Sequence, residues 1–118
     1  MVNKTPTIDM LQAGLKATGM RGRALANNIA NMHTSGYRRY EVEFEQLLAR
    51  ELARDEKVDL RKLAPKLYRP MNTPLNAEGN DVDIDHEVGQ MVKNGAMYRT
   101  YMKMLGKMYQ QIEAAISG

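Results

Sequence analysis

The sequence predicts an all-α protein in which long N- and C-terminal helices pair as an antiparallel or coiled-coil-like hairpin, with a short middle helix and a loosely ordered linker. Two observations support this prediction. Apolar residues near both ends of the 118-residue chain recur at alternating steps of three and four residues, the spacing of one helix face packed against another helix. The segment between them holds three of the four prolines and keeps no regular period.

The first helix is expected to begin near residue 6 and to end near Met32. Thr5 is the expected N-cap, and Pro6 suits the first helical position because its fixed φ is already helical. The main apolar row of this helix consists of Ile8, Leu11, Leu15, Thr18, Gly22, Leu25, Ile29 and Met32, and a second row of small residues and methionines consists of Met10, Ala13, Ala17, Met20 and Ala24. Its three internal glycines each cost about 1 kcal/mol relative to alanine, so this helix should depend on packing.

The segment 37–54 carries two conflicting patterns. Tyr40, Val42 and Phe44 alternate with glutamates as in a strand, whereas Phe44, Leu47 and Leu48 follow a helical period. We favour a short extended piece followed by a helix from about Glu43 to Arg54. The chain then divides into residues 1–36 (first helix and turn), 37–54 (extended piece and short helix), 55–83 (a linker expected to be irregular or partly disordered) and 84–118 (the last helix).

The last helix carries two apolar rows on different faces. The longer, called here the heptad row, consists of Ile84, Val88, Met91, Gly95, Tyr98, Met102, Leu105, Tyr109, Ile112 and Ile116. The second row consists of Met97, Tyr101, Met104 and Met108. We expect the heptad row to pair with the first helix. Because one helix cannot cover both rows, the surplus face predicts helices from other subunits, and the alternative is a monomeric bundle with a third helix over the second row.

Aspartates before the last helix have two possible roles. Asp81, Asp83 and Asp85 alternate as in a calcium loop, but His86 and Val92 stand where such a loop needs glycine and glutamate. Helix capping by Asp83, with acidic residues in the first turn, is the better explanation.

Composition argues against several functional classes. The chain has no cysteine, a net charge of +3, and histidines without metal-ligand spacing, and it contains none of the common phosphate-binding or nucleophile motifs. We therefore expect no catalytic residue, metal or cofactor. The basic residues lack the interleaved aromatics of a nucleic-acid surface, and no run approaches the roughly 18 to 20 apolar residues of a membrane span. The first residues lack the features of a secretory signal.

Two segments resemble a known family. The run from Ala26 to Arg39, ANNIANMHTSGYRR, resembles the N-terminal signature of the bacterial flagellar axial family, the rod and hook proteins, with Ser35 where proline is usual. The short length, the segment GNDVDIDHEVGQMVKN (79–94) and the chain's ending through Ile112, Ala115, Ile116 and Gly118 resemble the proximal rod proteins of that family. The resemblance covers about residues 8–45 and 79–118.

The resemblance implies a structural subunit of the flagellar basal-body rod that self-assembles through its terminal helices and transmits torque. Implied partners are other rod proteins, further copies of the chain, the adaptor that joins rod to membrane ring, and the flagellar type III export apparatus. The implied location is the rod in the periplasmic space, reached without a cleaved signal peptide. A cytoplasmic helical adaptor or chaperone-like interaction protein is the alternative, and neither nucleic acid nor a direct membrane span is expected.

The expected assembly interface draws on both helices. Its residues are Leu11, Leu15, Leu25, Ile29, Asn27, Asn28, Asn31, Val88, Met91, Tyr98, Met102, Leu105, Tyr109, Ile112, Ile116, Met97, Tyr101, Met104 and Met108, and the signature turn is marked by Thr34, Gly36 and Tyr37. Asparagine is a poor helix former, so the three amides must face water or make specific bonds. The family resemblance implies that at least one bonds the turn or a neighbouring subunit, with Asn31 the first candidate.

Overall fold

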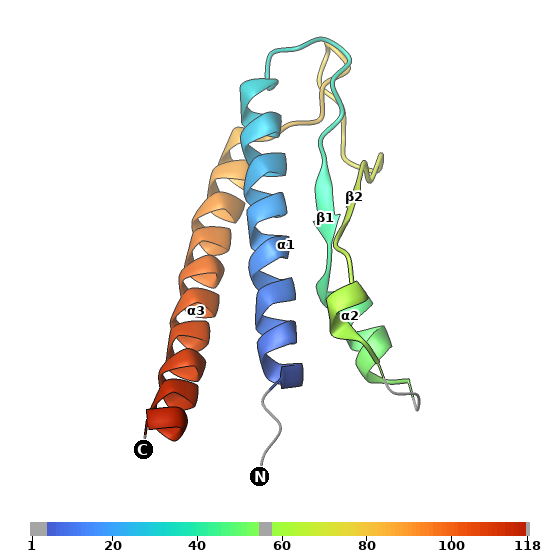
Figure 1. The fold of residues 1–118 in the computed structure, drawn as a ribbon. Coiled ribbons are helices and arrows are strands. Elements are labelled where there is room, and N and C mark those ends of the chain that lie inside the picture. The colour runs from blue at the N-terminus through green and yellow to red at the C-terminus, as the bar shows by residue number, and fades with distance from the viewer. Residues whose placement is uncertain (1–4, 55–57, 118) are drawn as a thin grey trace.

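Two long antiparallel helices form the body of the molecule (Figure 1). The computed structural model describes residues 5–54 and 58–117. Helices α1 (Thr5–Ala30) and α3 (Ile84–Ser117) lie side by side, and an arm packs on the other side of α1. This arm contains β1 (Glu41–Glu43), α2 (Glu45–Leu52), the 3-10 helix η1 (Leu60–Lys62) and β2 (Lys66–Tyr68). The molecule is elongated, measuring 63 × 30 × 15 Å.

The predicted pairing of the terminal helices is confirmed, and the helix limits are close to those predicted. Helix α1 starts at Thr5 and ends two residues before Met32, while α3 starts at Ile84. The expected cap by the Thr5 side chain lies outside the described side chains. At the start of α3, the Asp83 carboxylate accepts the backbone N–H of Asp85 at 3.0 Å, so the predicted capping role is confirmed.

A two-stranded sheet corrects the all-α prediction. Strands β1 and β2 pair antiparallel, with Val42 opposite Leu67. The alternation through Val42 therefore gives a strand, and the helical period that starts at Phe44 gives α2, so both patterns in this segment are realised in succession. Part of the segment expected to be a loosely ordered linker is regular, because residues 66–68 belong to the sheet and η1 is capped by Asp59, while most of the remaining described residues in it have no helix or strand.

Phe44 joins the arm to α1. Its side chain is 1 % exposed and packs against Ala13 and Ala17, with Leu48 and Leu63 completing the cluster. The small residues of α1 leave room for this ring, and burying an aromatic side chain is among the larger apolar contributions in a chain of this size. The second row of α1 is therefore covered by the arm of the same molecule.

The helix pair uses a different face of α3 from the one predicted. The sequence predicts that the heptad row faces the first helix, but of its large side chains only Leu105 is buried. The face that meets α1 passes instead through Glu87, Asn94, Tyr101 and Leu105, with Met108 half-buried beside them. Polar groups with specific partners occupy this face, which is why apolar periodicity alone misplaced it.

Gly14 allows the two helices to approach closely. A Cβ at this position would lie 2.5 Å from the ring of Tyr101, which is well inside van der Waals contact. The glycine that weakens α1 as an isolated helix is thus the residue that admits the aromatic ring of α3. None of the helices in the described ranges is both long and apolar enough to cross a bilayer.

Candidate assembly surface and polar cluster

The outer face of α3 is a half-exposed apolar surface. Toward its C-terminal end, the Tyr109 hydroxyl accepts a hydrogen bond from Nε2 of Gln12 in α1 at 3.0 Å. Six large side chains of the heptad row are 38–49 % exposed, namely Ile84, Val88, Met91, Tyr98, Met102 and Tyr109, and Ile116 is 81 % exposed. This group is called the outer face below. Several exposed apolar side chains in line on one helix, over about seven turns, are typical of an interaction surface rather than of isolated surface residues.

The second row of α3 is divided between environments. Met97, Tyr101 and Met108 are half-buried on the side of α1, whereas Met104 is 45 % exposed. Burial raises the pKa of the Tyr101 hydroxyl above its ordinary value, with a further contribution from the charge of Glu45. Of the remaining expected interface positions, Ile112 is half-buried, so it does not extend the outer face.

In α1, the expected interface residues are mostly covered by the chain itself. Leu11 and Leu25 are buried, and Leu15 and Ile29 are half-buried. Helix α1 lies between α3 and the arm, so its apolar residues form the centre of the molecule (Figure 1). The surface available to other copies is therefore concentrated on α3.

Buried polar residues join the signature turn to the start of α3. Five side chains form this polar cluster: Asn28, Arg39, Asn80, Asp81 and Glu87, each 0–4 % exposed. Buried polar groups are costly unless each finds a partner, so a satisfied cluster fixes one arrangement of its segments.

Asn28 is the link between helix and turn. Its Nδ2 donates to the backbone oxygen of Tyr40 at 2.9 Å and to Glu87 Oε2 at 3.1 Å. Its Oδ1 accepts the backbone N–H of Tyr40 and the hydroxyl of Tyr37, both at 2.9 Å. Burial raises the pKa of that Tyr37 hydroxyl, which keeps it protonated as a donor. This amide accordingly uses all of its bonding capacity inside the molecule.

The other two asparagines make weaker local bonds. Asn27 Nδ2 donates to the hydroxyl of Tyr37 at 2.8 Å on an exposed surface. Asn31 Nδ2 donates to the backbone oxygen of Asn27, and Asn31 Oδ1 accepts the hydroxyl of Thr34. Thus Asn28, rather than Asn31, has the most extensive contacts.

Glu87 and Arg39 form a buried ion pair at the centre of the cluster. Arg39 Nε donates to Glu87 Oε1 at 2.6 Å, and Arg39 also pairs with Glu41. Burial of Arg39 disfavours its charge, but its bonds to Glu87 and Glu41 outweigh burial and raise its pKa. The same bonds affect Glu41: burial would raise its pKa, but hydrogen bonds from Arg39 and Tyr68 lower it below its ordinary value.

Asp81 and Asn80 attach the preceding loop to the turn. Asp81 accepts the backbone N–H of Arg39 at 2.6 Å and pairs with Arg38 at 3.0 Å. Asn80 Nδ2 donates to the backbone oxygens of Asn31 and Thr34, at 2.9 and 2.8 Å, and so adds a side-chain bond to two oxygens that already accept backbone N–H groups within the turn.

Two glycines allow the backbones to meet at this point. Gly36 donates its N–H to the backbone oxygen of Glu78 at 2.9 Å, and Gly79 packs against Gly36. Both have positive φ, 74° and 76°. Gly36 thus closes the signature turn in the left-handed conformation, and the two segments that carry the family resemblance are in direct contact.

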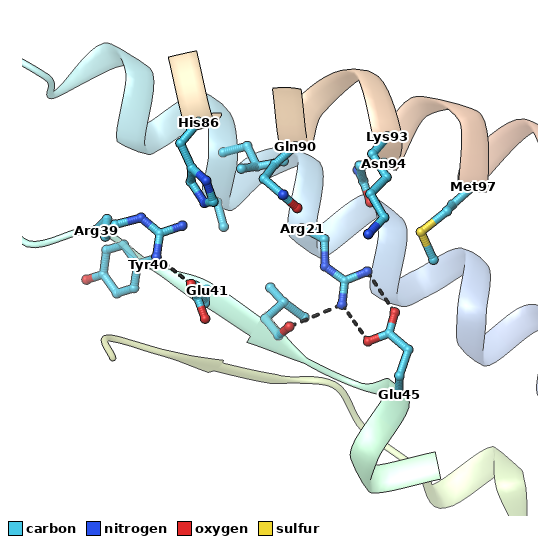
Figure 2. A pocket seen from close by; sticks show the side chains of 13 residues that line it. Arg21, Arg39, Tyr40, Glu41, Glu45, His86, Gln90, Lys93, Asn94 and Met97 are labelled. Atoms are coloured by element: carbon cyan, nitrogen blue, oxygen red, sulfur yellow. Dashed lines mark hydrogen bonds and ion pairs between the residues drawn. The ribbon is translucent and has the colours of Figure 1, made fainter. Parts of the chain in front are cut away.

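A groove of about 450 Å³ lies between β1 and the helix pair (Figure 2). Arg21 crosses it, donating twice to the carboxylate of Glu45 and once to the backbone oxygen of Val42. Asn94 also lines it, donating to the backbone oxygen of Thr18 at 2.9 Å. These bonds fix the arm and α3 to α1, so the groove contributes to the packing of the monomer.

The residues 5–54 and 58–117 contain no group of three or more His, Asp or Glu side chains that could hold a metal ion. The exposed carboxylate of Asp83 caps α3, and the carboxylates of Asp81 and Glu87 are paired with arginines.

Sequence reasoning missed most of the polar cluster. Asn28 was identified because three asparagines near one helix end are unusual. The sequence pattern does not single out Glu87, Arg39 or Asn80. A buried ion pair between residues 48 positions apart leaves no local pattern, and neither do the contacts of Asn80 with Asn31 and Thr34.

The chain is similar to flagellar basal body rod proteins along most of its length. No family model matches the chain. It is 26% identical to the flagellar basal body rod protein FlgB of Bacillus subtilis over 95% of this chain and 94% of that protein, and 24% identical to FlgB of Borreliella burgdorferi over 93% and 95%. It is also 30% identical to the flagellar basal-body rod protein FlgG of Caulobacter vibrioides, over 74% of this chain but 27% of that protein. The resemblance inferred from the sequence is confirmed.

Proposed function

We propose that this chain, a homologue of flagellar basal-body rod proteins, is a structural rod subunit that assembles with further copies or other rod proteins through the outer face of α3. Its similarity to rod proteins of the FlgB type spans almost the whole chain. The observation that supports this assembly surface is the apolar outer face, which the chain's own α1 and arm leave about half exposed.

Burial energetics support this assignment. Removing apolar surface from water contributes about 25 cal/mol per Å². Covering this row of half-exposed large side chains with a helix of another subunit would therefore contribute several kcal/mol to each subunit contact. In a polymer such contacts repeat at every subunit. Torque would then pass through packed helices, whose interiors deform little.

The polar cluster supports the same function in another way. It fixes the angle at which the turn and the arm leave the helix pair, because each buried group is bonded to a specific partner. We propose that this rigid end gives each subunit a defined shape in the rod. Placement in the periplasmic part of the basal body, passage through the type III export apparatus and contact with the adaptor to the membrane ring belong to the same proposal, and the similarity to rod proteins supports them.

The proposal is tested by placing a charge on the outer face. Met102→Asp should leave the helix content and the unfolding midpoint of the purified chain nearly unchanged, because Met102 is 47 % exposed. In cells it should abolish motility and remove the chain from isolated basal bodies, since an unpaired carboxylate in a closed interface costs several kcal/mol.

Lys107→Asp is the matched control. Lys107 is exposed on α3, five residues further along and outside the heptad row. Its replacement should preserve motility. Equal swimming of both variants, or equal loss, would contradict the assignment of assembly to the outer face.

A further inference from the structure

Val92 is an exposed apolar residue that neither row of α3 explains. It is 69 % exposed, more than any large side chain of the heptad row except Ile116. It lies beside Met91 on the edge of the outer face that is turned away from α1. Seven residues before it on this edge stands Asp85, and seven after it stands Arg99. At 1.5 Å per residue, each charge is about 10 Å from Val92 along the helix axis.

Neither of these charged side chains is paired with an opposite charge in the described part of the chain. Within residues 5–54 and 58–117, neither the Asp85 carboxylate nor the Arg99 guanidinium forms a salt bridge. Asp85 lies in the first turn of α3, where the helix dipole favours it. Arg99 has no such advantage, because Lys103 follows one turn later and like charges at that spacing repel.

We propose that two copies of this chain form an antiparallel dimer through the N-terminal half of the outer face of α3, with the twofold axis at Val92. In antiparallel helix packing the same edges of the two helices meet. An axis at Val92 therefore brings Asp85 beside Arg99 of the second copy, and by symmetry brings the reciprocal pair together. The two Val92 side chains meet between these pairs.

The apolar residues fit the same alignment. It places Val88 near Tyr98 of the second copy, Ile84 near Met102, and Met91 near Gly95, where the missing side chain leaves space for the methionine. The members of each pair are offset by two residues, about 3 Å along the helix axis. The large side chains in this set are 38–47 % exposed in the single chain.

Other alignments fit less well. An axis at Arg99 brings the two arginines together and places Asp85 beside Glu113. An axis at Gly106 pairs Arg99 with Glu113, but it relies on Leu105, which is already buried against α1. A parallel pair in register brings like charges to the same height.

This dimer goes beyond the proposed rod role. A twofold contact closes at two copies, whereas a growing rod needs contacts that continue from subunit to subunit. The dimer would therefore cover the outer face of the free chain and would have to open before incorporation.

Sedimentation equilibrium on the purified full chain tests the proposal. The wild type should dimerise. Arg99→Glu replaces two attractive pairs with two repulsive ones and should weaken dimerisation by roughly tenfold or more. The exchange Asp85→Arg with Arg99→Glu should restore it to within about threefold, which also shows that the single variant is not merely misfolded.

Glu113→Arg is the matched control, because it alters a charge that the Arg99 and Gly106 alignments use and the Val92 alignment does not. It should dimerise as the wild type does. A monomeric wild type, an unaffected Arg99→Glu variant, or a Glu113→Arg variant weakened as much as Arg99→Glu would each overturn the proposal. These outcomes leave the rod role untouched, since Met102→Asp in cells tests that separately.

Disulfide cross-linking tests the position of the axis, because the chain has no cysteine of its own. Val92→Cys should cross-link on oxidation in solution. Tyr109→Cys should not, since its two copies would lie about 50 Å apart along the helices. Equal cross-linking of both variants would indicate a parallel pair and overturn the antiparallel arrangement.

Discussion

The two faces of α3 reverse the usual distribution of polarity. The inner face, toward α1, buries a glutamate and an asparagine beside Leu105 and half-buries a tyrosine, while the outer face exposes valine, methionine and tyrosine side chains. Apolar character therefore does not identify the face that is buried within this chain. The inner face is selected by specific partners, such as Asn28 for Glu87 and Gly14 for Tyr101, and the outer face is left for contacts between molecules.

The largest loss of stability on the inner face is expected from replacing Glu87. Glu87→Ala leaves the buried guanidinium of Arg39 with Glu41 as its remaining ionic partner, and it removes an acceptor of the Asn28 amide. We expect a loss of about 3–5 kcal/mol in the free energy of unfolding, measured by urea denaturation. Such a loss approaches the whole stability of a small domain.

Glu113→Ala is the control for that variant, because Glu113 is an exposed glutamate of the same helix. Its effect should stay within about 0.5 kcal/mol. A similar unfolding free energy for both variants would mean that the polar cluster does not hold the fold.

Gly14 tests the inner face by steric contact. Gly14→Ala should destabilise the chain by roughly 1–2 kcal/mol, because the new Cβ displaces the Tyr101 ring. In a Tyr101→Ala background the same change should instead stabilise by up to about 1 kcal/mol, since alanine is the better helix former.

Gly106→Ala is the control for Gly14→Ala and is made in the same two backgrounds, wild type and Tyr101→Ala. A Cβ at Gly106 meets nothing within 4 Å, so the substitution should be mildly stabilising in either background. The close-approach explanation fails if Gly14→Ala has the same sign with and without the tyrosine ring.

A smaller effect is expected from acid at Glu41. Its pKa is lowered in the folded chain, so its contribution to stability is present above its ordinary value near 4.5 and is lost as pH falls below it. The difference in unfolding free energy between wild type and Glu41→Gln should therefore shrink as pH decreases from about 5 toward 3. A difference that grows in acid would have the wrong sign for this ion pair.

Sequence periodicity predicted the positions and pairing of the long helices but not the face through which they pair. Apolar spacing is a local signal, and it placed α1, α2 and α3 within a few residues of their limits. Burial of Glu87 depends on Arg39 and Asn28, which lie on other segments, so no local pattern announces it. Strand β2 is short and pairs with a distant segment, and the prolines around it indicate turns rather than a strand.

The most direct test of the central claim is cysteine labelling on the outer and inner faces of α3. In the cysteine-free chain, Met102→Cys and Leu105→Cys place single thiols three residues apart, one exposed and one buried. We expect a maleimide to react rapidly with Met102→Cys in the dilute free chain and slowly with the same thiol in isolated basal bodies. Leu105→Cys should react slowly in both. If Met102→Cys reacts as rapidly in the basal body as in the free chain, the outer face is not the assembly surface.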